Sequence, residues 1–501
     1  MDEEWAHADD AERGSASLIS PIDTSAFSRV TGLSNATNSL TESAQKALAN
    51  AGLEASALSL FSNQASTAAE ALNAPARGLP DHTLDGVHEI PSPNYTIPNL
   101  ASRDLDIHLY PKPNWQQLII LGNGFDLQCG LRSRFGDFFR SRFERIESIQ
   151  DYSKETWKSL IKDSDLTVWD FILEANIDGS WCDVEGTIES WVLSAAGPKT
   201  RSSLFWCALN CMKEFPFTDR LPVIVKAGSR LAGEEDDRSY LLGNIARYVW
   251  TLFSDNHRYT SDMFIGLLRQ DLGRLERFFG DYLSREITND RGYAAKCKGL
   301  YRAIDEDGKQ DGDHFCVSTS VLSFNYTSQI EDFFDKGDDG VFVNIHGKLG
   351  EEIVFGIDGK DCMDDSIAVP FTKTYRLMLR GGTRTDGLIS TANSSNLQDA
   401  TDIIKFYGHS LGKADYSYFQ SIFDGVDLYE SKTALVFYYP YDDSEDGEKN
   451  NNEWRERLAN SINDLLVAYG ATMDNADHGK NLMHKLLLEG RLIIRGVQID
   501  S

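Results

Sequence analysis

An apolar run that leads directly into two closely spaced glycines constrains this chain more than any other feature. Residues 118–121 are Leu-Ile-Ile-Leu, and Gly122-Asn123-Gly124 follows at once, before an amphipathic segment that extends to residue 139. A buried strand that ends in such a turn and opens a helix is typical of α/β proteins that bind nucleotides, because glycine lets backbone N–H groups approach a phosphate. Many strand–helix turns contain glycine, so nucleotide binding here is a hypothesis that needs support from the rest of the chain.

Short apolar runs of the same kind return in the second half of the chain. After the first run at 117–121, they occupy residues 317–324, 341–345, 353–355, 403–407, 434–439 and 492–497. Apolar runs this short between turns are typical of strands that are buried on both faces. Helical patterns between several of them predict an α/β fold with a doubly wound, mostly parallel, Rossmann-like sheet.

Residues 140–312 separate the first predicted strand from the others and have a helical, aromatic-rich pattern. In residues 263–283, apolar side chains recur at the i, i+3, i+4 spacing of an amphipathic helix. The pattern predicts a large helical insertion within an α/β domain that covers residues 113–501. We expect the insertion to form a lid or a second subdomain over the nucleotide site.

Residues 1–112 differ from the rest, because they are rich in Ala, Ser, Asn and Thr. Leu and Ala recur at helical spacing in residues 39–72, and repeated prolines from residue 75 to residue 113 indicate an extended linker. One interpretation is a partly disordered tail. The other is a helical arm for self-association, and the sequence leaves both open.

The charge balance excludes several classes of partner. The 77 acidic residues outnumber the 49 basic ones and give a net charge of -28, so phosphate backbones and anionic membranes would be repelled. The seven cysteines include no Cys-x-x-Cys pair, which argues against structural zinc and against a disulfide framework. The acidic N-terminus has no signal-peptide pattern, and no apolar run reaches the roughly 18 residues of a membrane span. We therefore expect a cytoplasmic protein without a metal site.

Three further polar motifs follow predicted strands, and they are Phe324-Asn325-Tyr326-Thr327, Ile345-His346-Gly347 and Gly408-His409-Ser410-Leu411. Each has a structural alternative: Asn325 could cap a helix, His346 could be an ordinary turn histidine, and Gly408 could make a tight turn. In a parallel sheet, however, ligands bind outside the carboxyl ends of the strands. All four strand-end motifs would then meet at one edge and supply backbone donors, an amide, an imidazole and a hydroxyl, which suits a dinucleotide site with one general acid or base.

These motifs, in this order, resemble the bacteriophage abortive infection protein AbiH family. The segments concerned are GNGFDLQCGL, FNYTSQIE, IHGKLGEEIVFGID and YGHSLGKADYSYF, and Trp181-Cys182-Asp183-Val184-Glu185 is similar to the W-x-D-x-E stretch of that family. The resemblance covers roughly residues 115–500 and leaves out the N-terminal hundred. It implies a role in antiphage defence.

The motif order is also similar, more distantly, to that of sirtuin-like NAD-binding domains. By this resemblance, Gly122, Asn123 and Gly124 would contact the NAD+ pyrophosphate. Asn325 would hold the nicotinamide ribose or a water, and His346 would be the general base. The remaining residues implied on the nucleotide side are Phe125, Thr327, Gly408, His409 and Ser410.

Two positions depart from the sirtuin pattern. Thr327 stands where sirtuins have an Asp that helps to hold nicotinamide, and Asp126 stands where the last serine of their first motif lies. Asp126 could stabilise positive charge or hold ribose hydroxyls, so it joins Asn325 and His346 as a candidate catalytic residue. The sequence lacks the four-cysteine zinc module of deacylating sirtuins, which argues against protein deacylation as the activity.

The resemblances imply hydrolysis of the nicotinamide glycosidic bond of NAD+, with NAD+ as substrate and no separate cofactor. They also imply a phage-derived trigger and a homo-oligomer, without direct binding to nucleic acid or membrane. Two alternatives stay open. One is a non-catalytic nucleotide-binding or protein-interaction module in phage defence, and the other is a hydrolase of a different nucleotide.

Overall fold

The computed structural model describes residues 95–96, 114–147, 154–163, 165–174, 183–197, 203–214, 234–253, 259–309, 316–334, 340–360, 362, 365–381, 385, 387–391, 401–444 and 447–499. All of them lie in one compact unit made of Pro80–Ile177 and Trp181–Ser501. The predicted N-terminal arm, residues 1–112, lies outside the described residues except for Tyr95–Thr96. The division into an arm, a domain and a helical insertion stays a prediction.

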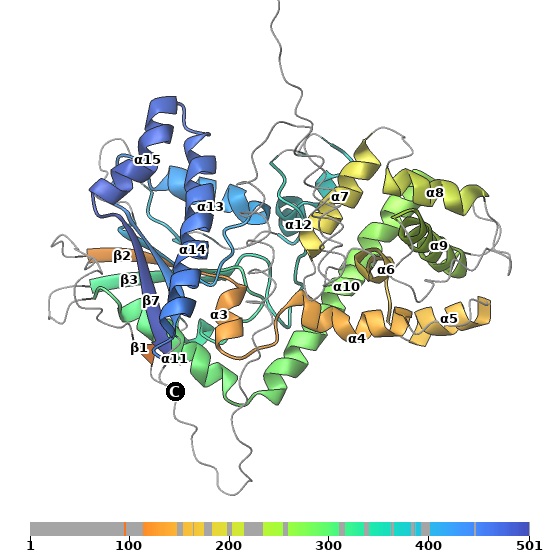
Figure 1. Ribbon diagram of the computed structural model, residues 1–501, viewed down its shortest axis with the longest axis horizontal. Helices are drawn as coiled ribbons and strands as arrows, with labels where there is room; N and C mark the ends of the chain where they lie inside the picture. The colour runs from red at the N-terminus through yellow and green to blue at the C-terminus, as the bar shows by residue number, and fades with distance from the viewer. Residues whose placement is uncertain are drawn as a thin grey trace, which may run out of the picture. The chain divides into compact units, whose positions relative to one another are not determined.

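A seven-stranded sheet organises the described residues (Figure 1). Its strands are β1 (Tyr95–Thr96), β2 (Asn114–Leu121), β3 (Cys316–Ser323), β4 (Phe342–Asn344), β5 (Ile403–Tyr407), β6 (Ala434–Tyr441) and β7 (Leu492–Ile499). The spatial order is β1-β7-β6-β5-β2-β3-β4. Strands β2 to β7 pair in parallel, and only the two-residue edge strand β1 pairs antiparallel, with β7. The predicted mostly parallel α/β sheet is confirmed.

The chain changes direction across the sheet at β2. From β2 it moves outward to β3 and β4, and it then returns to the other side of β2 to form β5, β6 and β7. Numbered in chain order, the six parallel strands follow the order 3-2-1-4-5-6, which is the order of dinucleotide-binding folds. The switch point of such a sheet, where ligands bind, lies between β2 and β5.

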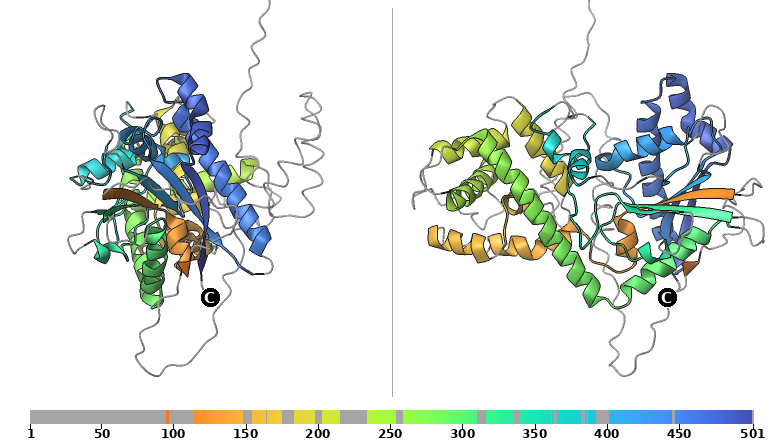
Figure 2. Two further views of the ribbon diagram at one scale, coloured as in Figure 1. Left: turned by 90° about the vertical axis from the view of Figure 1, so that its left-hand side faces the viewer. Right: turned by 180° about the vertical axis from the view of Figure 1, so that it is seen from behind.

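Neighbouring residues of β2 point to opposite faces of the sheet and belong to two different hydrophobic cores. Leu118 and Ile120 belong to a core completed by α13 (Tyr416–Gly425), α14 (Gly447–Gly470) and α15 (Ala476–Leu488). Ile119 and Leu121 belong to the other core, with α10 (Ser261–Asn289) and α11 (Tyr293–Glu306). Figure 2 shows these two sets of helices in further views. A strand covered on both faces needs apolar residues at every position, which explains the continuous apolar run.

The regular secondary structure described between β2 and β3 consists of helices. They are α3 (Asn123–Gln128), α4 (Phe135–Glu147), α5 (Lys154–Asp163), α6 (Val168–Glu174), α7 (Val184–Ala196), α8 (Leu204–Glu214) and α9 (Glu234–Leu252), followed by α10 and α11. Helix α10 begins where the Thr260 side chain accepts the N–H of Met263 at 3.2 Å, and its apolar stripe is buried as the spacing predicts. Among the described residues, no helix is long and apolar enough to cross a membrane.

The predicted strand at residues 353–355 is wrong. The N–H of Val354 donates to the His346 carbonyl at 2.9 Å, and the N–H of Phe355 donates to the Glu276 carboxylate at 2.6 Å. The carbonyls of Ile353 and Phe355 accept from arginines of α12 (Lys373–Leu379) and the residue that follows it, Arg380. The backbone groups are therefore satisfied largely by side chains, and the apolar run is buried without joining the sheet.

Candidate functional site

The loops that follow β2 and β5 touch each other at the switch point. The N–H of Gly122 donates to the Tyr407 carbonyl at 3.0 Å, and the N–H of Gly124 donates to the Gly408 carbonyl at 2.8 Å. A Cβ atom on Gly122 would lie 2.4 Å from Cα of His409, and one on Gly124 would lie 2.6 Å from Cα of Gly408. Close packing of two backbones thus explains why both positions are glycine. Contact of this turn with a nucleotide stays a prediction.

The other predicted nucleotide-side residues of these loops have different surroundings. Ser133 donates its hydroxyl to the side-chain oxygen of Asn123 at 2.5 Å. The Phe125 ring is buried and lies edge-on to Tyr407, with ring centroids 6.2 Å apart. Ser410 is exposed, and its hydroxyl accepts the N–H of Gly412 at 3.4 Å. Of these three side chains, those of Asn123 and Ser410 are exposed, and only that of Phe125 is buried.

A half-buried carboxylate, Asp415, lies between the two predicted histidines. Its Oδ1 is 3.3 Å from Nε2 of His346, and its Oδ2 is 3.4 Å from Nε2 of His409. Nδ1 of His409 accepts the N–H of Leu411 at 2.9 Å, so neutral His409 carries its proton on Nε2, facing Asp415. The side chains of both histidines are only 4% exposed.

Lys373 and Glu185 extend this group of charges. Nζ of Lys373 lies 2.7 Å from Oδ1 of Asp415 and 2.7 Å from Oε1 of Glu185. Lys373 begins α12, where the Thr372 side chain caps the helix. Glu185 lies in the first turn of α7, which Asp183 caps by accepting the N–H of Gly186 at 2.8 Å. The W-x-D-x-E stretch thus supplies one helix cap and one member of the site.

Burial and the neighbouring charges decide the protonation of the cluster. Burial raises the pKa of Glu185 to about 7, against the attraction of Lys373. Although burial opposes its ionisation, Lys373 and His346 hold the pKa of Asp415 well below its usual range. Burial and Lys373 lower the pKa of His346 to about 4. His346 is therefore a neutral base at neutral pH, and Glu185 can gain or lose a proton there.

Asn325 lies in the loop after β3, and Asn344 is the last residue of the neighbouring strand β4. The Asn344 amide donates to the carbonyls of Asn325 and Thr327, both at 2.8 Å, and so holds the loop after β3. Asn325 is 4% exposed, and its Oδ1 has no hydrogen-bond partner among the described residues. The structural alternative for Asn325 is wrong, since the next described helical turn begins at Glu331 with Ile330 in the cap position. Folded proteins rarely leave a buried oxygen without a partner, so this oxygen marks a place for a water or ligand.

Asp126 points away from the glycine turn towards Thr327. Its Oδ1 accepts from the Thr327 hydroxyl at 3.0 Å and from the Tyr293 hydroxyl at 2.8 Å. Burial raises the pKa of Asp126 to about 7, and the two hydrogen bonds oppose this rise. Asp126 and Thr327 are the two departures from the sirtuin pattern, and they are bonded to each other. The carboxyl ties α3 to α11 and to the loop that carries Asn325.

The candidate site is closed. Asp126, Asn325 and His346 are 2%, 4% and 3% exposed. The Phe324 ring lies edge-on to His346, with centroids 5.4 Å apart, and the Tyr418 ring lies 5.8 Å from His346. A substrate can reach these side chains only after some of the covering groups move.

Sequence reasoning missed four residues of the site: Glu185, Tyr293, Lys373 and Asp415. Glu185 and Asp415 stand within motifs that carry the family resemblance, so the signal for these two was present. Lys373 and Tyr293 begin helices far along the chain from their partners, and nothing local distinguishes them. Within the part of the chain that the structure describes, no group of three or more His, Cys, Asp or Glu side chains could hold a metal ion.

Comparison with known proteins adds one finding. A family model described as "Bacteriophage abortive infection AbiH" matches residues 118–439, which is more than half of the chain. The match begins in β2 and ends in β6, and it includes every residue of the candidate site. No curated protein and no solved structure matches.

Proposed function

The chain belongs to the AbiH family and so has a role in bacteriophage abortive infection, and on this premise we propose that it hydrolyses the nicotinamide glycosidic bond of NAD+. The products would be nicotinamide and ADP-ribose. The observation that carries the proposal is the pair of polar side chains that follow β3 and β4. Asn325 has a buried oxygen without a partner among the described residues, and His346 is kept neutral in a buried site.

The strand order supports a dinucleotide as the ligand. The parallel strands follow the order of dinucleotide-binding folds, and the predicted residues come from loops at the carboxyl ends of β2, β3, β4 and β5. The sirtuin-like motif order supports NAD+ in particular.

The proposed step breaks the bond between the ribose C1′ and the nicotinamide nitrogen. Its electron pair returns to the cationic nitrogen, so nicotinamide leaves as a neutral molecule and the sugar becomes oxocarbenium-like. Water then attacks C1′ and loses a proton. Asn325 would orient that water or a ribose hydroxyl through its free oxygen, and neutral His346 would accept the proton. Asp415 would stabilise the imidazolium that forms.

Asp126 and Glu185 have supporting roles in this proposal. Asp126 bonds Thr327 and so positions the loop that carries Asn325. Glu185, whose pKa burial raises to about 7, can hold the proton that leaves the cluster, with Lys373 between it and Asp415. In this proposal Asp126 positions a loop, whereas the sequence led us to expect that it would contact the ribose or its positive charge directly.

The closed site supports control of the activity. Uncontrolled NAD+ hydrolysis would harm the host cell, and a site whose Asn325 and His346 are almost fully buried cannot bind NAD+ without opening. We propose that a phage-derived component opens it. Helix α7 is the element most directly concerned, because its Glu185 closes the charge cluster.

The test measures NAD+ in bacteria that express the chain, before and after infection by a phage that it blocks. NAD+ should fall after infection, with nicotinamide and ADP-ribose appearing together. The variants Asn325→Ala and His346→Ala should reduce the rate of loss by about 10²- to 10⁴-fold. Asn481→Ala and His484→Ala are matched controls, since both residues are exposed on α15, and they should behave as wild type.

An unchanged NAD+ level during an infection that the wild type blocks would refute the proposal. Purified full-length protein supplies the second measurement, in which lysate from infected cells is added and nicotinamide release is followed by chromatography. A thermal-unfolding curve for each variant separates loss of chemistry from loss of fold.

One observation favours a second candidate, a non-catalytic nucleotide-binding module. Two N–H groups of the glycine turn are bonded to the β5 loop, so in this closed state they do not form an open phosphate site. In this case NAD+ or another nucleotide would bind saturably without turnover. The purified-protein measurement distinguishes the two candidates, because only the enzyme releases nicotinamide.

A further inference from the structure

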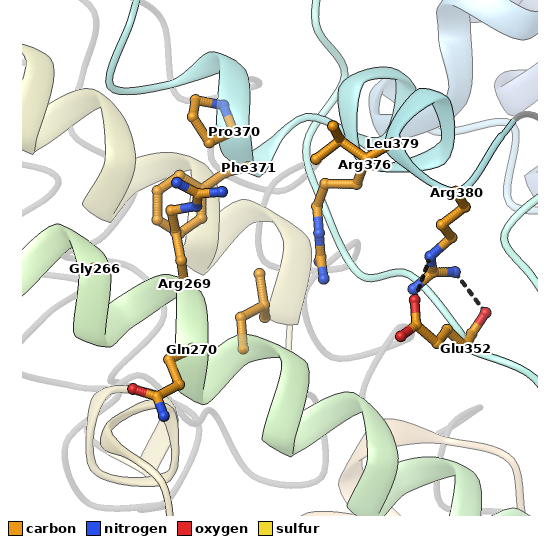
Figure 3. Close-up of a pocket in the computed structure, with 10 residues that line it drawn as sticks. Gly266, Arg269, Gln270, Glu352, Pro370, Phe371, Arg376, Leu379 and Arg380 are labelled. Atoms are coloured by element: carbon orange, nitrogen blue, oxygen red, sulfur yellow. Dashed lines mark hydrogen bonds and ion pairs between the residues drawn. The ribbon is translucent and has the colours of Figure 1, made fainter.

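A second concave site lies away from the strand-end loops, between α10 and α12. Its volume is about 410 Å³, and Figure 3 shows its two walls. The residues that line it are Gly266, Arg269, Gln270, Leu272, Glu352, Pro370, Phe371, Arg376, Leu379 and Arg380. None of them belongs to the predicted NAD+ site. A volume of this size is typical of small-molecule sites.

Three arginines and one carboxylate, that of Glu352, line this cleft in a chain whose net charge is -28. Arg269 is an exposed residue of α10, and no ion pair or hydrogen bond joins its side chain to the described residues. Arg376 and Arg380 stand on the opposite wall (Figure 3). Guanidinium groups that line a cleft from two walls attract an anion.

The arginines of α12 are held in position by the protein. Arg376 bonds both carboxylate oxygens of Glu276, and Arg380 bonds the Glu352 carboxylate at 3.0 Å and the Ile353 carbonyl at 2.9 Å. These contacts fix the side chains without using every N–H of the two guanidinium groups. A ligand that bonds the remaining donors would therefore lose little side-chain freedom on binding.

A purely structural role would explain why Arg376 and Arg380 are present, but it would not explain Gly266 and Arg269 on the α10 wall. Gly266 lies within α10, where glycine is unfavourable, and a Cβ atom on it would meet nothing within 4 Å. Packing therefore does not require glycine there. Gly266 and Arg269 are three residues apart, so they lie on one face of the helix, and the missing side chain leaves space beside the guanidinium.

We propose that this cleft binds a phosphate-bearing small molecule of about mononucleotide size. The phosphate would lie between Arg269 on one wall and Arg376 and Arg380 on the other. The apolar or aromatic part would lie against Leu379, which is 63% exposed. Phosphate suits three guanidinium groups better than a carboxylate does, because a phosphomonoester carries more charge and offers three terminal oxygens. The proposal does not depend on the reaction at the strand-end site.

The test uses isothermal titration of the full-length protein with AMP, adenosine and inorganic phosphate as probes. AMP should bind saturably, and both fragments should bind at least about tenfold more weakly, since each lacks one half of the interaction. Arg269→Glu should weaken AMP binding about 10- to 100-fold. Arg277→Glu is the matched control, because Arg277 is exposed on the same helix, lies outside the cleft, and makes the same change in net charge.

A second pair of variants tests the space beside Gly266. Gly266→Ala adds one methyl group in open space and should leave AMP binding unchanged within about twofold. Gly266→Leu should block the cleft and abolish measurable binding, while the thermal midpoint of the apoprotein should be no lower than that of wild type. Asn325→Ala and His346→Ala should bind AMP as wild type does, which distinguishes this cleft from the strand-end site.

The proposal is overturned if AMP does not saturate at millimolar concentration, or if Arg269→Glu and Arg277→Glu weaken it equally. Binding that is lost in Asn325→Ala but kept in Gly266→Leu would assign AMP to the strand-end site and would also overturn it. Weaker AMP binding at higher salt supports it, because screening acts on the arginine–phosphate attraction.

Discussion

The Asp126→Asn variant should gain stability relative to wild type as the pH rises from acidic to alkaline. Asp126 is 2% exposed, and its Oδ1 accepts hydrogen bonds from Tyr293 and Thr327. An asparagine has nearly the same shape and can keep its oxygen in the Oδ1 position, so it preserves both acceptor contacts. It removes the ionisation of a buried carboxyl and places an NH2 group where Oδ2 lies 3.1 Å from the Thr327 hydroxyl.

The size of the effect follows from the pKa of Asp126. Burial raises it from 3.8 to about 7. As the pH rises from about 4 to about 7, the unfolded chain releases the proton while the folded protein keeps it, so the free energy of unfolding falls. At about 1.4 kcal/mol per pH unit, wild type loses about 2–3 kcal/mol between pH 5 and pH 8 through this one group. The Asp126→Asn variant does not lose it.

The assay is urea unfolding followed by tryptophan fluorescence, at pH 5 and at pH 8. The difference in unfolding free energy, variant minus wild type, should increase by about 2–3 kcal/mol between the two pH values. All other titrating groups are common to both proteins and cancel in this difference. Asp281→Asn, on the exposed surface of α10, is the control and should give no such increase. An equal difference at both pH values would show that Asp126 is not kept protonated by burial.

Three further predictions concern the loops and the charge cluster. Gly124→Ala should lower the unfolding free energy by about 1–3 kcal/mol, because the added Cβ would lie 2.6 Å from the backbone of the loop after β5. Gly266→Ala adds its methyl group in open space and should cause no loss in the same urea unfolding experiment. Lys373→Met leaves the half-buried carboxyl groups of Glu185 and Asp415 without their cation and should cost about 3–5 kcal/mol. Combining it with Glu185→Gln should recover at least about 1 kcal/mol, and equal losses in the single and double variants would contradict a shared charge. Burial and Lys373 lower the pKa of His346 to about 4. The pH profile of kcat/KM for the Glu185→Gln variant should therefore stay flat from pH 8 to pH 6 and fall near pH 4. A fall centred near pH 6.5 would contradict the lowered pKa of His346.

The sheet could be predicted from local sequence because burial on both faces leaves a local signature. Leu118 and Ile119 point to different cores, yet both must be apolar. A continuous apolar run between turns therefore marks a strand with helices on both sides. The run at residues 353–355 has the same signature without being a strand, because only its long-range partners, such as Glu276 and Arg376, decide where its backbone hydrogen bonds go.

The edge of the sheet that carries the candidate site was also predictable. Parallel strands all end at one edge, so the motifs that follow β2, β3, β4 and β5 must meet there whatever the details of packing. This topological rule brings Asn325 and His346 to the same edge. It also brings the glycine turn against Gly408, but it does not predict that the two backbones touch.

The sequence by itself determined the fold class, the family and the strand-end motifs, because each depends on short-range pattern or on motif order. Only the tertiary structure decided which side chains meet. In the folded protein Asp126 accepts a hydrogen bond from Thr327, Lys373 forms ion pairs with both Glu185 and Asp415, and burial keeps His346 neutral. These contacts join residues far apart in the chain, and a pKa depends on burial and on neighbours in space, so no local pattern records them.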